Sequence, residues 1–143
     1  MILREMLVDD LDKVMEIEET VSLVPWTKEG FFAFLTRNDV MFLVVEEKQE
    51  ILGYCGIMMV LDEGDVLNVV VRKERQREGI GNFLMQSLLR LAAEQGIQMI
   101  HLEVRKGNET AIRLYERLGF KRDGIRKNYY TDPVEDAILM TKN

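Results

Sequence analysis

The segment that constrains the fold most is a β-rich run that ends in a glycine-bearing turn and opens the longest amphipathic stretch of the chain. Val69–Val71 lead into Gln76–Gly81, and apolar residues then recur at helical spacing as far as Gln95. Gly96 stands where such a helix would stop. A strand, a tight turn and a helix in this order begin a strand–helix–strand crossover, which predicts an α/β domain.

The turn has the features of an anion-binding site. Backbone N–H groups at the start of a helix are free, and with the positive helix end they attract phosphate oxygens. Gly79 and Gly81 would let a phosphate approach the backbone without meeting a Cβ. The segment is neither a Walker loop nor a dinucleotide-binding G-x-G-x-x-G turn, since only two glycines are present. On spacing alone, an ordinary helix-starting turn explains it equally well.

The distribution of charge also favours an anion site here. The 143-residue chain has a net charge of −6, whereas Arg72–Gly81 contains four cations and two acids. A chain that is acidic overall is not expected to bind nucleic acid, which normally requires a basic surplus. Its surface favours cationic partners instead.

Composition excludes several other classes of protein. With one cysteine and one histidine, the chain can form no internal disulfide and is not expected to hold a metal ion. No run approaches the roughly 18 uninterrupted apolar residues of a membrane span, and charged residues interrupt the first twenty positions, so no signal peptide is expected. We therefore expect a cytoplasmic, metal-free protein in which residues 1–143 form one domain without membrane contact.

Periodicity and turn residues predict the remaining elements. Helices are expected over Asp9–Val21, Lys28–Thr36, Gly79–Gln95 and Glu109–Leu118. Strands are expected over Ile2–Met6, Met41–Glu46, Ile51–Leu61, Val66–Val71, Met99–Arg105, Phe120–Arg126 and Val134–Met140, with Asp62–Asp65 as a turn. Antiparallel hairpins come first and a crossover follows, so the sheet should be mixed.

Two side chains are candidates for acid–base chemistry. On the strand Met99–Arg105, Glu103 shares a face with His101 and Arg105. A carboxylate there is either half of an ion pair, with Arg105 or another cation, or a general base. Tyr115 lies on the apolar face of its helix, so it is a core aromatic with its hydroxyl at the margin, a proton donor, or both at once.

Several motifs together resemble one enzyme family. Gln76-x-x-Gly79-x-Gly81, placed after a strand and before a helix, resembles the pyrophosphate-binding signature of the GNAT acetyltransferases. Leu102–Arg105, Asn108 and Ala111–Phe120 resemble the second half of the same fold. Further tracts resemble the branch of ribosomal-protein-alanine N-acetyltransferases, the RimI branch: Pro25-Trp26, Leu61–Glu63, Arg126–Tyr130 and Glu135–Met140. The resemblance spans nearly the whole chain.

The resemblance implies a mixed, twisted sheet of about seven strands with helices on both faces, splayed where acetyl-CoA enters. It implies that the backbone of Val69, Val70 and Val71 holds the pantetheine arm and the acetyl carbonyl, and that a bulge near Val69 leaves an N–H free to polarise that carbonyl. Asn108 would hydrogen-bond the cofactor. The pyrophosphate would be cradled by Gln76, Arg77, Glu78, Gly79, Ile80, Gly81 and Asn82.

The same resemblance assigns the chemistry. Glu103 would take a proton from the attacking amine, directly or through water, and Tyr115 would protonate the departing thiolate. Trp26, Tyr129 and Tyr130 would flank a groove for the acceptor. The acceptor would be an N-terminal alanine of a small-subunit ribosomal protein. An α-amine, with a pKa of about 7.7–8.0 against about 10.4 for lysine, is more often neutral at pH 7.

Two other functions stay open from the sequence. A GNAT enzyme of this size could acetylate a small amine such as a polyamine or an aminoglycoside. The chain could also be a catalytically silent module that senses acyl-CoA.

Overall fold

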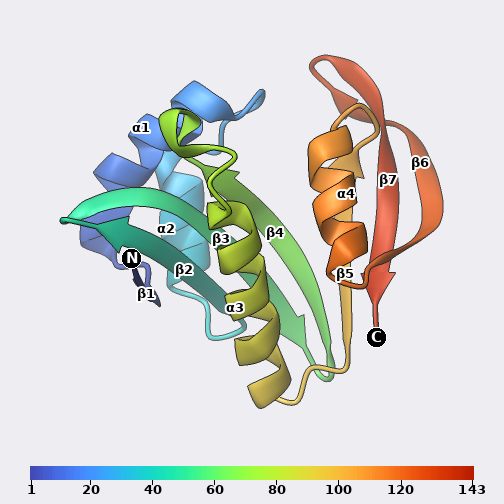
Figure 1. Cartoon of the computed structure of the whole chain (residues 1–143), viewed down its shortest axis with the longest axis horizontal. Coiled ribbons are helices and arrows are strands. Elements are labelled where there is room, and N and C mark those ends of the chain that lie inside the picture. Colours follow the sequence, from blue (N-terminus) through green and yellow to red (C-terminus); the bar gives the residue numbers. More distant parts are fainter.

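Seven strands form one mixed sheet in the computed structural model, which describes residues 1–143 (Figure 1). Their order across the sheet is β1-β2-β3-β4-β5-β7-β6, and all neighbours are antiparallel except β4 and β5. The strands are β1 (Ile2–Glu5), β2 (Val40–Glu47), β3 (Glu50–Val60), β4 (Glu63–Val71), β5 (Met99–Arg105), β6 (Lys121–Thr131) and β7 (Val134–Lys142). The predicted mixed sheet is confirmed.

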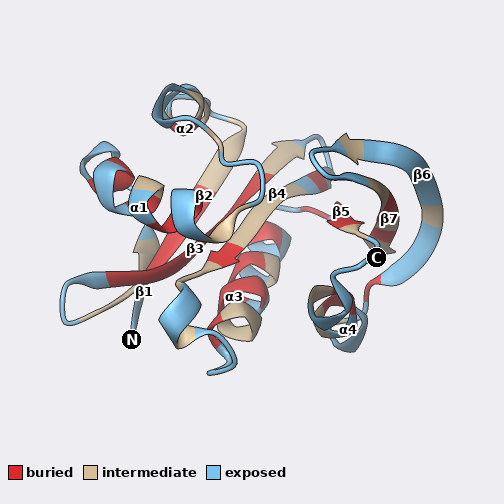
Figure 2. Cartoon of the chain, turned by 90° about the horizontal axis from the view of Figure 1, so that it is seen from above, coloured by how far each residue is buried: buried red, intermediate tan, exposed pale blue.

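Four α-helices cover the two faces of the sheet (Figure 2). On one face lie α1 (Leu11–Val21) and α2 (Lys28–Leu35), and on the other lie α3 (Ile80–Glu94) and α4 (Glu109–Arg117). Thr27 caps α2, since its Oγ1 accepts from the Gly30 N–H at 3.0 Å. Each face has its own apolar core, so the sheet is buried from both sides. None of these helices is long and apolar enough to cross a bilayer.

The strands β4 and β5 are paired only at their first residues. Glu63 lies opposite Met99, Gly64 opposite Ile100 and Asp65 opposite His101, and the two strands then diverge (Figure 1). From Val66 onward, β4 therefore has no partner strand on that side. The sheet is splayed at its centre, which leaves an opening between the carboxyl ends of two parallel strands.

A bulge interrupts the pairing of β4 with β3. Gly56 lies opposite Asn68 and Ile57 opposite Val66, so Leu67 is the extra residue. The bulge predicted near Val69 lies two residues before it. The sequence could not locate it, because β4 is apolar on both faces around Asn68 and gives no alternation from which to deduce the register.

Some boundaries also differ from those predicted. The strand β4 begins at Glu63, not Val66, because residues 63–65 pair with both β3 and β5, and this confines the turn before it to Leu61-Asp62. The helix α1 begins at Leu11, after a 3₁₀ turn over Val8–Asp10. The strand β6 continues past Arg126 to Thr131, across an irregularity between Arg126 and Tyr130.

Candidate functional site

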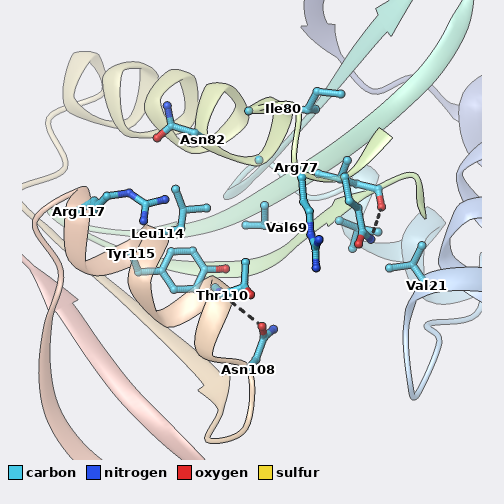
Figure 3. Close-up of a pocket in the computed structure, with 16 residues that line it drawn as sticks. Val21, Val69, Arg77, Ile80, Asn82, Asn108, Thr110, Leu114, Tyr115 and Arg117 are labelled. Carbon is cyan, nitrogen blue, oxygen red and sulfur yellow. Dashed lines mark hydrogen bonds between the residues drawn. The ribbon is translucent and has the colours of Figure 1, made fainter. Parts of the chain in front are cut away.

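Two adjoining cavities occupy the opening between β4 and β5. The Gly79 cavity, of about 470 Å³, lies between the end of β4, the turn that precedes α3, and α4 (Figure 3). The Glu103 cavity, of about 580 Å³, is lined by the end of α1, by β4 and β5, and by the end of β6. The two cavities share five lining residues: Val21, Val69, Val70, Asn108 and Tyr115. A ligand that occupies one can therefore reach the other.

The turn before α3 is shaped to receive an anion. Arg77 and Gly79 both have left-handed backbone conformations, with φ of 67° and 83°. No heavy atom lies within 4 Å of the point where a Cβ of Gly79 would stand. A Cβ on Gly81 would come no closer than 3.7 Å to Leu114 and 3.8 Å to Val71. Open space therefore adjoins the free N–H groups at the positive end of α3, which fits the requirement of a phosphate.

Two arginines supply positive charge to this cavity. Arg77 comes from the turn and Arg117 from the end of α4, and neither forms an ion pair (Figure 3). The other two arginines of the basic segment are paired, Arg75 with Glu78 at 2.9 Å and Arg72 with Glu50 at 3.4 Å. Arg77 is thus the unpaired arginine of the segment, and it lines the cavity.

Not every residue of the predicted cradle presents its side chain to the cavity. The Glu78 side chain lies outside the lining and pairs with Arg75. The Gln76 amide donates from Nε2 to the Val71 carbonyl at 3.2 Å, which fastens the turn to the end of β4. Val69, Val70, Val71, Gln76, Arg77, Gly79, Ile80, Gly81, Asn82 and Asn108 line the cavity as the sequence predicted.

The first turns of α4 form the opposite wall. Asn108 caps the helix, with Oδ1 accepting from the Ala111 N–H at 3.2 Å. Sequence reasoning missed five residues that also line this cavity: Val21, Thr110, Ala111, Leu114 and Arg117. Asn108, Ala111 and Leu114 are three residues apart and therefore share one face of α4. This spacing was the signal from which the other residues of that face could have been predicted. A helix face that is packed in the core shows the same spacing, so the pattern alone did not identify a cavity wall.

Tyr115 stands where the two cavities meet. Its side chain packs edge-on against Phe120, with 5.9 Å between the ring centroids, and the residue is only 9% exposed. Its hydroxyl is directed toward the cavity near Val69 (Figure 3). Burial raises the pKa of Tyr115 to about 12, so the phenol keeps its proton at neutral pH.

Glu103 lines the second cavity together with Tyr115. Its ion-pair partner is not Arg105, one of the alternatives from the sequence, but Arg126 on β6, at a long 3.9 Å between Oε1 and Nη1. The Glu103 side chain is 36% exposed. Interaction with this carboxylate raises the pKa of the neighbouring Tyr129. The carboxylate therefore stands at the cavity surface, with Arg126 and Tyr129 as its neighbours.

The three predicted acceptor-binding aromatics line the same cavity, from two sides. Trp26 lies between α1 and α2 and packs against Phe31, with 4.9 Å between the ring centroids. Tyr129 and Tyr130 lie on β6, edge to face at 5.1 Å. Burial raises the pKa of Tyr130 to about 12. The structure thus brings together residues that are about a hundred positions apart in the chain.

A buried carboxylate holds the wall of the Glu103 cavity to which Trp26 belongs. Glu18 is only 2% exposed, and it accepts from the Tyr54 hydroxyl at 2.5 Å and from the Trp26 N–H at 3.0 Å. Burial, together with this carboxylate, raises the pKa of the Tyr54 phenol. Both oxygens of Glu18 are satisfied, so its place at the cavity margin fixes the position of the chain at Trp26.

The opposite wall is held by Arg105. Its guanidinium donates to the Pro133 carbonyl at 3.0 Å and to Glu135 at 3.2 Å. Glu135 in turn accepts from the Gly107 N–H at 2.6 Å, and a Cβ on Gly107 would lie 2.7 Å from that carboxylate oxygen. A side chain at position 107 would therefore displace this carboxylate from its contact. The link joins the β5–α4 loop, which carries Asn108, to the β6–β7 hairpin, which carries Tyr130.

The arrangement combines an anion cradle, a carboxylate and a protonated phenol around one opening. No three side chains of His, Cys, Asp or Glu cluster closely enough to hold a metal ion. Residues 11–120 match the acetyltransferase (GNAT) family. The chain belongs to the GNAT acetyltransferases. Members of this family take their acetyl group from acetyl-CoA.

This GNAT acetyltransferase is similar to bacterial enzymes over most of its length. A Bacillus subtilis (strain 168) protein provisionally named ribosomal protein bS18-alanine N-acetyltransferase is 39% identical over 138 residues, which are 96% of this chain and 91% of the relative. The Escherichia coli (strain K12) ribosomal protein bS18-alanine N-acetyltransferase is 35% identical over 133 residues, which are 92% of this chain and 89% of the relative. These matches confirm the predicted resemblance to the RimI branch.

Solved structures agree with the fold of this GNAT acetyltransferase. The crystal structure of the Escherichia coli ribosomal-protein-S18-alanine N-acetyltransferase superposes with a TM-score of 0.91 at 32% identity, covering 99% of this chain and 92% of that one. Ard1 from Thermoplasma volcanium gives a TM-score of 0.91 at 27% identity, covering 99% and 95%. A spermidine N-acetyltransferase chimera shares the fold at 19% identity, so the fold alone does not select the acceptor.

Proposed function

We propose that this enzyme transfers the acetyl group of acetyl-CoA to the α-amine of an N-terminal alanine, and that its acceptor is the small-subunit ribosomal protein bS18. Support comes from relatives at 39% and 35% identity whose names state this activity. The observation that carries the proposal is that Glu103 and Tyr115 line one cavity. That cavity adjoins the Gly79 cavity, where an anion would bind.

The Gly79 cavity fits coenzyme A. The N–H groups of the turn at residues 77–82 would hold the pyrophosphate, with Arg77 and Arg117 balancing its charge. The unpaired edge of β4 at Val69–Val71 would hydrogen-bond the pantetheine arm, and Asn108 would contact it from α4. Acetyl-CoA supplies an activated acetyl thioester at the junction of the cavities.

Glu103 and Tyr115 divide the proton transfers between them. The Glu103 carboxylate takes the proton that the amine must lose in order to attack, directly or through a water molecule. The Tyr115 hydroxyl gives its proton to the departing thiolate; a free thiol has a pKa of about 8.5, so it needs only modest help. Burial raises the pKa of Cys55 to about 12, which makes a covalent enzyme intermediate on that thiol unfavourable and supports direct transfer.

Two features favour a peptide as the acceptor. The Glu103 cavity has separate walls, at Trp26 and at Tyr129-Tyr130, between which an extended chain can enter. An α-amine is also neutral at physiological pH far more often than a lysine or polyamine amine.

The proposal is tested by incubating the enzyme with acetyl-CoA and bS18 that carries a free N-terminal alanine, followed by peptide-resolved mass spectrometry. We expect one added acetyl group, on the α-amine. The control is the same protein with its N-terminus chemically blocked, which should gain none. Acetylation confined to lysine side chains, or no acetylation in either sample, would contradict the proposal.

A further inference from the structure

Asn68 on β4 has a side-chain amide whose burial without a partner nothing in the structure explains. Both polar atoms of its amide, Oδ1 and Nδ2, are buried and have no hydrogen-bond partner. No other buried side-chain nitrogen or oxygen in the chain lacks one. An unsatisfied amide costs stability, so a residue that keeps one at a cavity is a candidate for contact with a ligand.

The neighbours of Asn68 on β3 offer the amide no partner. Asn68 lies opposite Gly56, which has no side chain, and the next residue across is Phe42. The Phe42 ring lies over this glycine, since a Cβ on Gly56 would clash with Cε1 of Phe42. On this side the amide faces an apolar surface. On the side of β5, the residue lines the Glu103 cavity.

The bulge brings Asn68 level with Glu103 across that opening. The last paired residues are Asp65 on β4 and His101 on β5. Glu103 lies two residues beyond His101, on the same face as the His101 side chain. Asn68 lies three residues beyond Asp65, but Leu67 is the extra residue of the bulge, so Asn68 occupies the equivalent level. Both residues line the Glu103 cavity.

We propose that the Asn68 amide binds the leading residue of the acceptor peptide, opposite Glu103. This assignment rests on the proposed function. An amide can accept a hydrogen bond from the terminal amine through Oδ1 and donate one to the first peptide carbonyl through Nδ2, and that residue carries both groups. With Glu103 on one strand and Asn68 on the other, the amine is oriented between two acceptors. We expect the Asn68 side chain to turn toward the cavity that the residue lines when the peptide binds.

The proposal predicts that activity and stability change in opposite directions. Asn68→Leu keeps the approximate size and removes the unsatisfied amide, so we expect the melting temperature to rise by about 2–5 °C or stay unchanged. The kcat/KM for a peptide with a free N-terminal alanine should fall by about 10–100-fold, as for loss of hydrogen bonds to a charged group. The acetyl-CoA Kd, measured by calorimetry without peptide, should stay within about twofold of the wild-type value.

Asn38→Leu is the matched control, because Asn38 is exposed in the turn before β2 and lies outside both cavities. It should leave kcat/KM and acetyl-CoA affinity unchanged. If Asn68→Leu does not fold, Asn68→Ala is measured by the same three criteria.

A variant with peptide kcat/KM within about twofold of wild type would overturn the proposal. So would a joint loss of melting temperature, acetyl-CoA affinity and activity, which marks a purely structural role. If the wild-type enzyme leaves the peptide unmodified, the proposed function is contradicted, and the role of Asn68 with it. This outcome differs from the two above, in which the wild-type enzyme is active.

Discussion

Arg105 covers the ring of Tyr130, with its guanidinium carbon 4.3 Å from the ring centroid. The same guanidinium bonds to the Pro133 carbonyl and to Glu135, so one side chain holds both the aromatic wall and the hairpin that carries it. Because Glu135 also binds the backbone beside Asn108, the acceptor wall is tied to the loop that starts α4. The two halves of the site are thus joined by a chain of direct contacts.

Arg105→Lys should separate acceptor binding from cofactor binding. Lysine keeps the positive charge, but its ammonium group cannot donate to several coplanar acceptors or stack on the Tyr130 ring as a guanidinium does. We expect the KM for the acceptor peptide to rise by about 5–50-fold, corresponding to about 1–2.5 kcal/mol, with the KM for acetyl-CoA nearly unchanged. Arg37→Lys is the control, since Arg37 pairs with Asp39 on the surface at 2.8 Å, outside both cavities. An unchanged peptide KM in the Arg105 variant would contradict the proposed role.

Glu103→Gln should lower kcat by about 10²–10⁴-fold, because it removes a base while keeping the shape of the side chain. The loss should be largest below the pKa of the acceptor amine, where a proton must be taken. Glu116→Gln is the matched control: it breaks another long ion pair, with Arg122 at 3.6 Å, away from the cavities. Wild-type turnover in a folded Glu103→Gln protein would assign Glu103 to its ion pair with Arg126 instead.

Tyr115→Phe should slow kcat at least about tenfold with little change in acetyl-CoA affinity, because only a proton donor is lost. Thermal unfolding gives the control: a slower variant with a clearly reduced melting temperature would indicate a packing role.

The pH profile tests the same residue. Since burial raises the pKa of Tyr115 to about 12, the phenol remains protonated at every pH at which an amine acceptor is studied. The wild-type kcat/KM should rise with pH as the amine loses its proton near a pKa of about 8. The kcat/KM should then stay level to about pH 10, where an ordinary tyrosine would lose its proton. The raised pKa of Tyr115 moves the deprotonation of this acid to higher pH. A decline that starts below pH 9 would contradict the assignment.

Gly79→Leu should weaken acetyl-CoA binding strongly, because the side chain would occupy the space beside the free N–H groups of the turn. Gly96 provides an unusually close control. It has φ of 85° against 83° for Gly79, it too has no heavy atom within 4 Å of a Cβ position, and it lies at the opposite end of α3. Both variants should lose about 1–2 kcal/mol of unfolding free energy from the left-handed backbone, and only Gly79→Leu should lose affinity in calorimetry.

Local patterns in the sequence were sufficient for much of the fold. The glycines of the turn before α3 located the start of that helix, and the alternation along β5 placed Glu103 and Arg105 on one face. Pairings between distant residues were not accessible in this way. Arg105 meets Glu135 thirty positions away, and Glu103 meets Arg126 rather than its neighbour on the strand. Such partners depend on which strands the fold places side by side.

The contacts that hold the walls of the Glu103 cavity were the least predictable part. Glu18 follows the apolar period of its helix with no sign that it will be buried, and its two partners, Tyr54 and Trp26, come from different elements. The isolated amide of Asn68 depends on the bulge at Leu67, which an apolar strand does not reveal. A buried polar group is recognised only when its surroundings are known.

The central claim is that the enzyme acts on a protein α-amine, and a competition assay at pH 7–8 tests it most directly. The acceptors are a peptide with a free N-terminal alanine, the same peptide blocked at its N-terminus but carrying an internal lysine, and spermidine. We predict that the free-alanine peptide has by far the highest kcat/KM, because its amine is neutral more often and the cavity between Trp26 and Tyr130 admits an extended chain. Faster turnover of spermidine would contradict the account in favour of a small-amine acetyltransferase. Acetyl-CoA binding without turnover of any amine would contradict it in favour of a cofactor sensor.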